Sequence, residues 1–387
     1  MKRLIARGVV VCALSLLARP VLAQLPLTDK PIQPYLAGEG QQKFRSLEIL
    51  PDKKVTMRFL APRASEVKLS IGTARFDEGV YPMTKDADGV WSATIGPVPP
   101  EIYPYSFQVD GLTIRQGQIE VPAPAPQLYD RQRVPHGVMH EHIYFSKVQN
   151  RERNGLLVYT PPQYDTDPKR AFPVLYLWGG NERGANATNM WYPERRINDI
   201  LDNMNAQKLA VPMIVVIMSY AVPDEVGTST AAGRDMLSRE IGVDIIPFIE
   251  KHYRALPGRE NRGMAGASQQ GATSFDVAMA NLDKIANLGV FGTGLYGGLI
   301  NSPTFAPYPP FDFDKEMPVV AAKMKADKLK LWYMAVGTID PREPFNEKAV
   351  AEFEKYGVKP IFKTFTGGHQ DKVWRAATID FLKYVFK

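Results

Sequence analysis

The sequence predicts an α/β protein with a doubly wound, mainly parallel sheet, preceded by a small β-sandwich. Two patterns predict this order. Over residues 46–120 short alternating apolar and polar runs are separated by turn signals, which is typical of antiparallel strands. Over residues 137–387 apolar strand-like runs alternate with helical segments, as in a sheet covered by helices on both faces. A stiff Pro/Ala-rich stretch over residues 121–136 lies between them and is interpreted as a linker.

The first 23 residues have the composition of a secretory signal peptide. Three basic residues precede an apolar run over 9–17, and small residues at Val21 and Ala23 suit signal-peptidase cleavage. The alternative is a retained membrane anchor, but the run holds about ten residues and a membrane span needs about 20. We therefore expect cleavage after Ala23, a secreted or periplasmic protein with no membrane contact, and an extended leader over 24–45.

Charge and cysteine content exclude two classes of function. Four of the 47 basic residues and none of the 41 acidic residues lie in 1–23, so the formal charge of the remainder is +2. This charge gives no reason to expect a nucleic-acid partner. The single cysteine, Cys12, also lies in the removed segment. Disulfides and thiolate chemistry are therefore not expected.

The first domain, 46–120, shows period-two patterning. Apolar residues alternate with polar ones over 55–60, 67–71 and 105–109. Asp88-Gly89 and Asp110-Gly111 are hairpin turn signals between such runs.

The second domain, 137–387, contains six predicted strands and several predicted helices. Phe172–Trp178 and Met213–Met218 are continuous apolar runs, as expected of strands buried on both faces. The other predicted strands are 155–160, 263–267, 329–336 and 360–365. The predicted helices are 194–208, 238–255, 273–281, 344–356 and a terminal helix.

Ser268 is the candidate nucleophile. The stretch Gly263–Gly271 runs from a short strand through Gly266-Ala267-Ser268 into a helix, which is the layout of a nucleophile elbow. Such a turn needs a small residue two positions before the nucleophile, and Gly266 satisfies this. The alternative is an ordinary helix cap, because serine is favoured there.

Asp340 and His369 are the candidate partners of this serine. His369 follows the last predicted strand, and Asp340 follows the strand before it. The order Ser268, Asp340, His369 is the order of the α/β-hydrolase fold, so we predict a catalytic triad. Asp371 is a weaker candidate for the acid, because an acidic residue is favoured at a helix start anyway.

Further residues are candidates for an oxyanion hole and for substrate contacts. The backbone N–H of Gln269, at the start of a helix, is one predicted donor, and the glycine-rich turn at Gly180 and Asn181 is the other. Trp178, Gln270 and Trp374 are predicted to contact substrate. Trp191 and Tyr192 are also candidates for stacking, although burial in the core is the alternative for at least some of these aromatic residues.

Neither a metal nor a cofactor is expected. His140 and His142 are spaced like one face of a strand, but no carboxylate motif is spaced to complete a metal site with them.

These residues resemble carbohydrate esterase family one, which contains feruloyl and acetyl xylan esterases, with enterochelin esterases as relatives. The resemblance covers about residues 40–387. It rests on segments in both domains: 55–62, 88–91, 105–111, 159–164, 172–177, 266–271, 337–340 and 367–369 with 374–375. It implies an early-set, immunoglobulin-like first domain and the roles given above for Ser268, His369 and Asp340.

Three positions depart from the family pattern. The usual Leu-His-Gly-Gly is Trp-Gly-Gly-Asn at 178–181, the usual Met-Gly-Gly is Gln-Gln-Gly at 269–271, and the aromatic residue usually two positions after the base is Asp371. All three surround the expected active site. They indicate altered substrate preference or weakened catalysis rather than loss of the fold.

The sequence thus predicts an exported serine carboxylic-ester hydrolase that acts on feruloyl or acetyl esters of plant xylan. One alternative is a periplasmic hydrolase of siderophores or other small or aryl esters. The other is a non-catalytic carbohydrate-binding protein, because the first domain resembles glycan-associated modules. The oligomeric state is left open.

Overall fold

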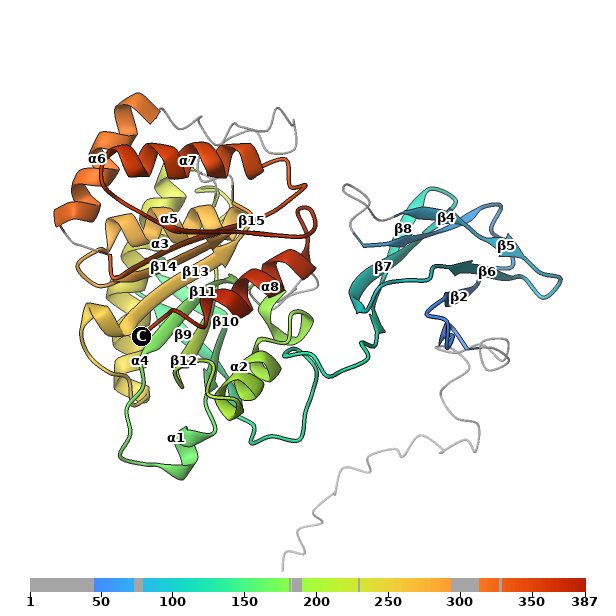
Figure 1. Ribbon diagram of the computed structural model, residues 1–387, viewed down its shortest axis with the longest axis horizontal. Helices are drawn as coiled ribbons and strands as arrows, with labels where there is room; N and C mark the ends of the chain where they lie inside the picture. The colour runs from blue at the N-terminus through green and yellow to red at the C-terminus, as the bar shows by residue number, and fades with distance from the viewer. Residues whose placement is uncertain are drawn as a thin grey trace, which may run out of the picture.

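The computed structural model describes residues 45–72, 79–180, 182, 190–228, 230–293, 313–326 and 329–387. The predicted signal peptide and nearly all of the predicted leader lie outside these ranges. Within them the chain forms a β-rich first domain and a larger α/β domain (Figure 1).

The first domain is a β-sandwich of two four-stranded antiparallel sheets. One sheet has the order β1-β2-β6-β5 and the other the order β4-β3-β7-β8. Alternate residues of both sheets, among them Met57, Leu69 and Phe107, point inward to one apolar core. The strands are β1 (Leu47–Ile49), β2 (Val55–Leu60), β3 (Val67–Ile71), β4 (Val80–Pro82), β5 (Thr84–Lys85), β6 (Val90–Ile95), β7 (Glu101–Val109) and β8 (Leu112–Val121).

The second domain is built on an eight-stranded sheet with the order β16-β15-β14-β13-β11-β12-β10-β9. The strands from β11 to β16 pair in parallel, whereas β10 pairs antiparallel with both β12 and β9. The strands are β9 (Val138–Ser146), β10 (Arg151–Thr160), β11 (Val174–Gly180), β12 (Ile214–Ser219), β13 (Arg262–Ala267), β14 (Asn287–Phe291), β15 (Leu331–Gly337) and β16 (Ile361–Phe365). The predicted doubly wound, mainly parallel sheet is therefore confirmed.

Helices cover both faces of this sheet. One face packs on α2 (Ile197–Ala206) and α8 (Asp371–Phe381). The other packs on α3 (Ala231–Glu240), α4 (Ile246–His252), α5 (Gln269–Ala280), α6 (Phe313–Ala326) and α7 (Glu343–Lys355). A short helix, α1 (Gln163–Thr166), follows β10.

Several elements differ from the sequence prediction, and β9, α1 and α6 were not predicted. The helix expected over 238–255 is α3 and α4 joined by a π-helical turn at Ile241–Ile245. Strand β14 was not predicted, because its sequence NLGVF is short and contains a glycine. Helix α5 begins at Gln269, directly after Ser268, rather than at 273.

The linker after the sandwich is held against the α/β domain. Asn203 on α2 donates hydrogen bonds to the carbonyl oxygens of Leu128 (2.8 Å) and Asp130 (2.7 Å). Arg375 on α8 forms an ion pair with Glu101 at the start of β7, which joins the second domain to the first.

Candidate active site

Ser268 occupies a strained turn between β13 and α5. Its backbone has φ 56° and ψ −129°, a conformation that non-glycine residues rarely adopt. Its N–H donates to the carbonyl oxygen of Phe291 at the end of the neighbouring strand β14, at 2.8 Å. The side chain therefore stands at the carboxyl end of the sheet, where ligands bind in open α/β folds.

Ser268, His369 and Asp340 form one hydrogen-bonded chain. The Ser268 Oγ lies 2.7 Å from His369 Nε2, and His369 Nδ1 lies 2.8 Å from Asp340 Oδ2. With a proton on Nδ1, the imidazole donates to Asp340 and accepts from the serine hydroxyl, which is the arrangement a general base needs. The three residues follow β13, β15 and β16, as the sequence predicts.

Asp340 is itself held in place. Its side chain is fully buried, and its Oδ1 accepts a hydrogen bond from the Arg342 backbone N–H at 3.0 Å. The alternative acid, Asp371, lies elsewhere: its carboxylate accepts a hydrogen bond from Arg195 Nε at 2.7 Å. Geometry therefore favours Asp340 over Asp371 as the partner of His369.

Burial lowers the pKa of His369 below its ordinary value of 6.5. The hydrogen bond to Asp340 acts in the opposite direction, and the positive charges of Arg342 and Arg195 add to the lowering. The imidazole is consequently neutral at neutral pH and ready to accept a proton.

The predicted oxyanion donors lie on adjacent elements. Strand β11 pairs with β13 through Trp178 and Gly266, so Gly180 at the end of β11 and Gln269 after the elbow lie at the same edge of the sheet. Gly180 also pairs with Ser219 at the end of β12. Asn181 lies outside the described residues. The donor roles of Gln269 and Gly180 stay predictions.

The predicted substrate contact of Trp178 is wrong. Its indole is fully buried in the apolar core between the sheet and α3–α7, and its Nε1 donates to the Met264 sulfur at 3.3 Å. Because β11 is covered on both faces, a side chain at this position packs against helices rather than facing a cleft. Trp191 is likewise fully buried, in the core on the opposite face.

Trp374 and Gln270 lie close to the predicted triad. The Trp374 ring packs edge-to-face on the His369 imidazole, with centroids 4.8 Å apart and an interplanar angle of 85°. Gln270 is buried in the first turn of α5, and its carbonyl oxygen accepts a hydrogen bond from the Ser274 hydroxyl at 2.7 Å. Their contacts with substrate stay predictions.

One other cluster could supply metal ligands within the described ranges: His136, Asp199 and Asp202. His136 Nδ1 lies 2.9 Å from Asp202 Oδ2, while Asp202 Oδ1 accepts from the Tyr159 hydroxyl at 2.6 Å. These bonds tie the end of the linker to β10 and α2. Among the helices of the described ranges, none has the length and apolarity of a membrane span.

Comparison with known proteins decides the family. The family model described as "Putative esterase" matches residues 146–385, which is more than half of the chain. The chain belongs to this esterase family. The match covers the entire α/β sheet except the first strand and includes Ser268, Asp340 and His369.

Both a curated protein and solved structures are similar to this esterase. An endo-1,4-β-xylanase/feruloyl esterase of Xylanibacter ruminicola is 26% identical in an alignment of 382 residues, and this alignment covers 92% of this chain and 46% of that protein. The esterase thus spans less than half the length of that relative. Among solved structures, the enterobactin esterase of Shigella flexneri has a TM-score of 0.64 at 13% identity and covers 90% of this chain and 99% of its own. A ferulic acid esterase of Anaeromyces mucronatus, in complex with ferulic acid, has a TM-score of 0.53 at 21% identity and covers 68% and 96%.

The structure of this esterase also reveals a residue that sequence reasoning missed. The Arg195 guanidinium lies between the rings of Trp191 and Trp374, 4.7 Å from each centroid. Its Nε binds Asp371, and its side chain is only 1% exposed. No sequence signal distinguishes this arginine from its neighbour Arg196, because its burial depends on the packing of α8 against the segment before α2.

Proposed function

We propose that this esterase is an exported serine carboxylic-ester hydrolase with Ser268, His369 and Asp340 as its catalytic triad. The observation that carries the proposal is the continuous hydrogen-bonded chain from the Ser268 hydroxyl through the His369 imidazole to the buried Asp340 carboxylate. Ester hydrolysis by a serine nucleophile needs this order of nucleophile, base and orienting acid.

The reaction proceeds by two acyl transfers. Ser268 Oγ attacks the ester carbonyl carbon while His369 Nε2 takes the hydroxyl proton, and backbone N–H groups of Gln269 and of the Gly180 turn stabilise the oxyanion. The tetrahedral intermediate collapses, and His369 returns the proton to the departing alkoxide. Water, deprotonated by His369, then attacks the acyl-enzyme and releases the carboxylic acid and Ser268. No cofactor takes part in this sequence.

We propose feruloyl or acetyl esters of plant xylan as the substrate class. The similarity to a xylanase/feruloyl esterase over nearly the whole chain supports this class. The signal-peptide pattern of residues 1–23 supports export, because polymeric xylan lies outside the cell.

A catecholate siderophore ester is the second candidate substrate. The observation that favours it is coverage: the enterobactin esterase superposes on 90% of this chain, and the ferulic acid esterase on 68%. The larger share includes much of the β-sandwich.

A substrate panel with a Ser268→Ala control tests the proposal. Wild type is expected to hydrolyse methyl ferulate or acetylated xylan faster than a catecholate trilactone, and Ser268→Ala to lose about 10⁴-fold or more in kcat. A fluorophosphonate probe should label wild type and leave the variant unlabelled. If neither protein were labelled and both bound xylan, the non-catalytic alternative would replace the esterase proposal.

A further inference from the structure

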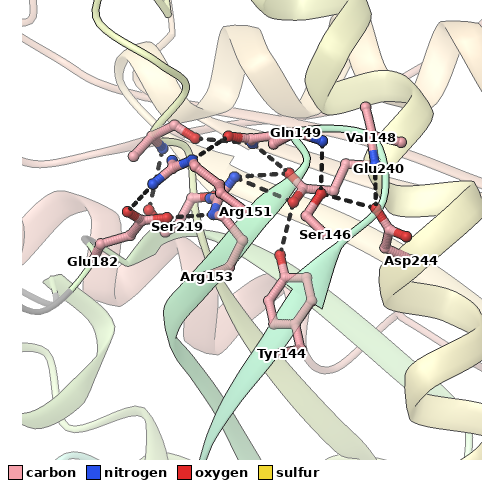
Figure 2. Close-up of polar contacts among 11 residues, drawn as sticks. Tyr144, Ser146, Val148, Gln149, Arg151, Arg153, Glu182, Ser219, Glu240 and Asp244 are labelled. Atoms are coloured by element: carbon pink, nitrogen blue, oxygen red, sulfur yellow. Dashed lines mark hydrogen bonds and ion pairs between the residues drawn. The ribbon is translucent and has the colours of Figure 1, made fainter.

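A second feature of the sheet edge is a buried network of charges beside Gly180. Gly180 is the last residue of β11, and Glu182 follows it two residues later. The Glu182 carboxylate forms ion pairs with two arginines of β10. Arg151 Nη1 donates to Glu182 Oε2 at 2.8 Å, and Arg153 Nε forms an ion pair with Glu182 Oε1. Figure 2 shows the Glu182 carboxylate facing the side chains of Arg151 and Arg153.

Arg153 also contacts β12, the strand that pairs with β11 at Gly180. Its Nη2 donates to the carbonyl oxygen of Ser219 at 3.1 Å, and Ser219 is the residue of β12 that pairs with Gly180. One guanidinium therefore binds both the segment that follows Gly180 and the strand end beside it.

Glu240 holds the guanidinium from the third side. Arg153 Nη1 donates to both of its carboxylate oxygens, at 3.2 and 3.0 Å. The same carboxylate accepts from the Tyr144 hydroxyl at 3.0 Å and from Gln149 Nε2 at 2.9 Å (Figure 2). Glu240 ends α3, so the network connects that helix to β9, β10, β12 and the segment after β11.

Because the charged side chains of this network are buried, the network is energetically unfavourable unless it serves a function. The Arg153 side chain is 1% exposed and that of Glu240 is fully buried. Removing such a pair from water is energetically unfavourable, and apolar residues of the same size often stabilise a core as well or better. Apolar residues would lack the directed geometry of a planar guanidinium, which binds three partners at fixed angles. The three partners are Glu182, which follows Gly180 in sequence, Ser219, which pairs with Gly180 on β12, and Glu240 at the end of α3.

We propose that Arg153, braced by Glu240, is a positioning residue that holds the end of β11 at Gly180 in the place required of an oxyanion donor. This inference rests on the proposed esterase function. The network contacts neither Ser268 nor His369 in the described residues; it acts through the backbone at Gly180 and Ser219. A donor must stand within hydrogen-bond distance of an oxyanion that exists only in the transition state, so a small displacement lowers kcat rather than substrate affinity.

Glu182→Gln is the most direct test, because it removes the charge that attaches the segment after Gly180 and leaves Arg153 paired with Glu240. With a soluble ferulate ester, kcat is expected to fall about 10–100-fold with KM changed less than about threefold. The inhibition constant of a boronic acid, which forms a tetrahedral adduct with the serine, should rise by the same factor as kcat/KM falls. The midpoint of the acid limb of the pH profile, which reports His369, should stay in place.

Glu250→Gln is the matched control. Glu250 pairs with Arg262, the first residue of β13, at the opposite end of the strand from Ser268. It should leave kcat within about twofold of wild type. Arg153→Met, which leaves Glu182 and Glu240 without their shared partner, should reduce kcat at least as far as Glu182→Gln and also lower the melting temperature.

The outcomes separate the two proposals. Full activity of Glu182→Gln, or a loss no greater than that of Glu250→Gln, overturns the positioning role and leaves the triad intact. A rise in the KM of Glu182→Gln with an unchanged kcat also overturns the positioning role. If wild type has no Ser268-dependent turnover, the esterase proposal fails, and the positioning role fails with it.

Discussion

Gly266 and Gln270 approach each other so closely that a Cβ on Gly266 would stand 2.4 Å from the Gln270 carbonyl oxygen. The same Cβ would lie 2.6 Å from the Ser274 Oγ. This contact is the physical reason for a glycine two residues before Ser268, because the strand turns directly back onto the first turn of α5.

Gly266→Ala should therefore damage both folding and activity. The obstacle is backbone, which cannot rotate away, so we expect a loss of about 1–3 kcal/mol in the free energy of unfolding. We also expect a fall of about 100-fold in kcat, because the elbow that presents Ser268 must shift. Urea unfolding and ester hydrolysis measure the two effects.

Gly263→Ala on the same strand is the control. There the three atoms nearest to a Cβ would be side-chain atoms, the closest being Phe386 Cζ at 3.2 Å. If Gly266→Ala were as stable and active as Gly263→Ala, the close approach to Gln270 would not constrain the elbow.

The pH dependence of kcat/KM should report the lowered pKa of His369. The neutral imidazole is the base, so activity falls as the pH drops through this pKa. Since burial holds that pKa below 6.5, the midpoint of the acid limb should lie below pH 6.5. A profile on an uncharged ester measures it, and a midpoint above pH 6.5 would contradict the assigned environment of His369.

Asp340→Asn and Asp371→Asn together identify the orienting acid. Asp340→Asn removes the charge beside His369 Nδ1, and we expect kcat to fall by about 10²–10⁴. Because Asp340 raises the pKa of His369, any residual activity should have its acid limb at still lower pH. Asp371→Asn, which loosens Arg195 instead, should keep kcat within about tenfold. The reverse order of losses would assign the role to Asp371.

Trp178→Leu should affect stability without affecting substrate affinity. The indole is fully buried in the core, so its truncation should lower the free energy of unfolding by about 2–4 kcal/mol. KM for an aryl ester should stay within about twofold, measured well below the melting temperature. A large rise in KM at unchanged stability would restore the substrate-binding role predicted from sequence.

Much of the fold and three central residues of the site could be predicted because their signals are local. Continuous apolar runs mark β11 and β12, and a strand–glycine–serine–helix sequence marks the elbow at Ser268. Asp340 and His369 could be placed because each follows a predicted strand, and parallel strands bring their carboxyl ends to one edge. Strand β14 escaped prediction because its sequence NLGVF is short and contains a glycine, and its place in the sheet comes from pairing with β13 and β15.

The sequence by itself determined the order of the elements and the residues with the chemistry of an esterase. Only the tertiary structure decided which large polar and aromatic side chains are buried, and against what. Trp178 lies in the core and Trp374 against His369, although both are tryptophans near expected site motifs. Arg153 meets Glu182, Ser219 and Glu240 from three other elements. Such contacts join positions far apart along the chain, and local patterns carry no information about which of these positions meet.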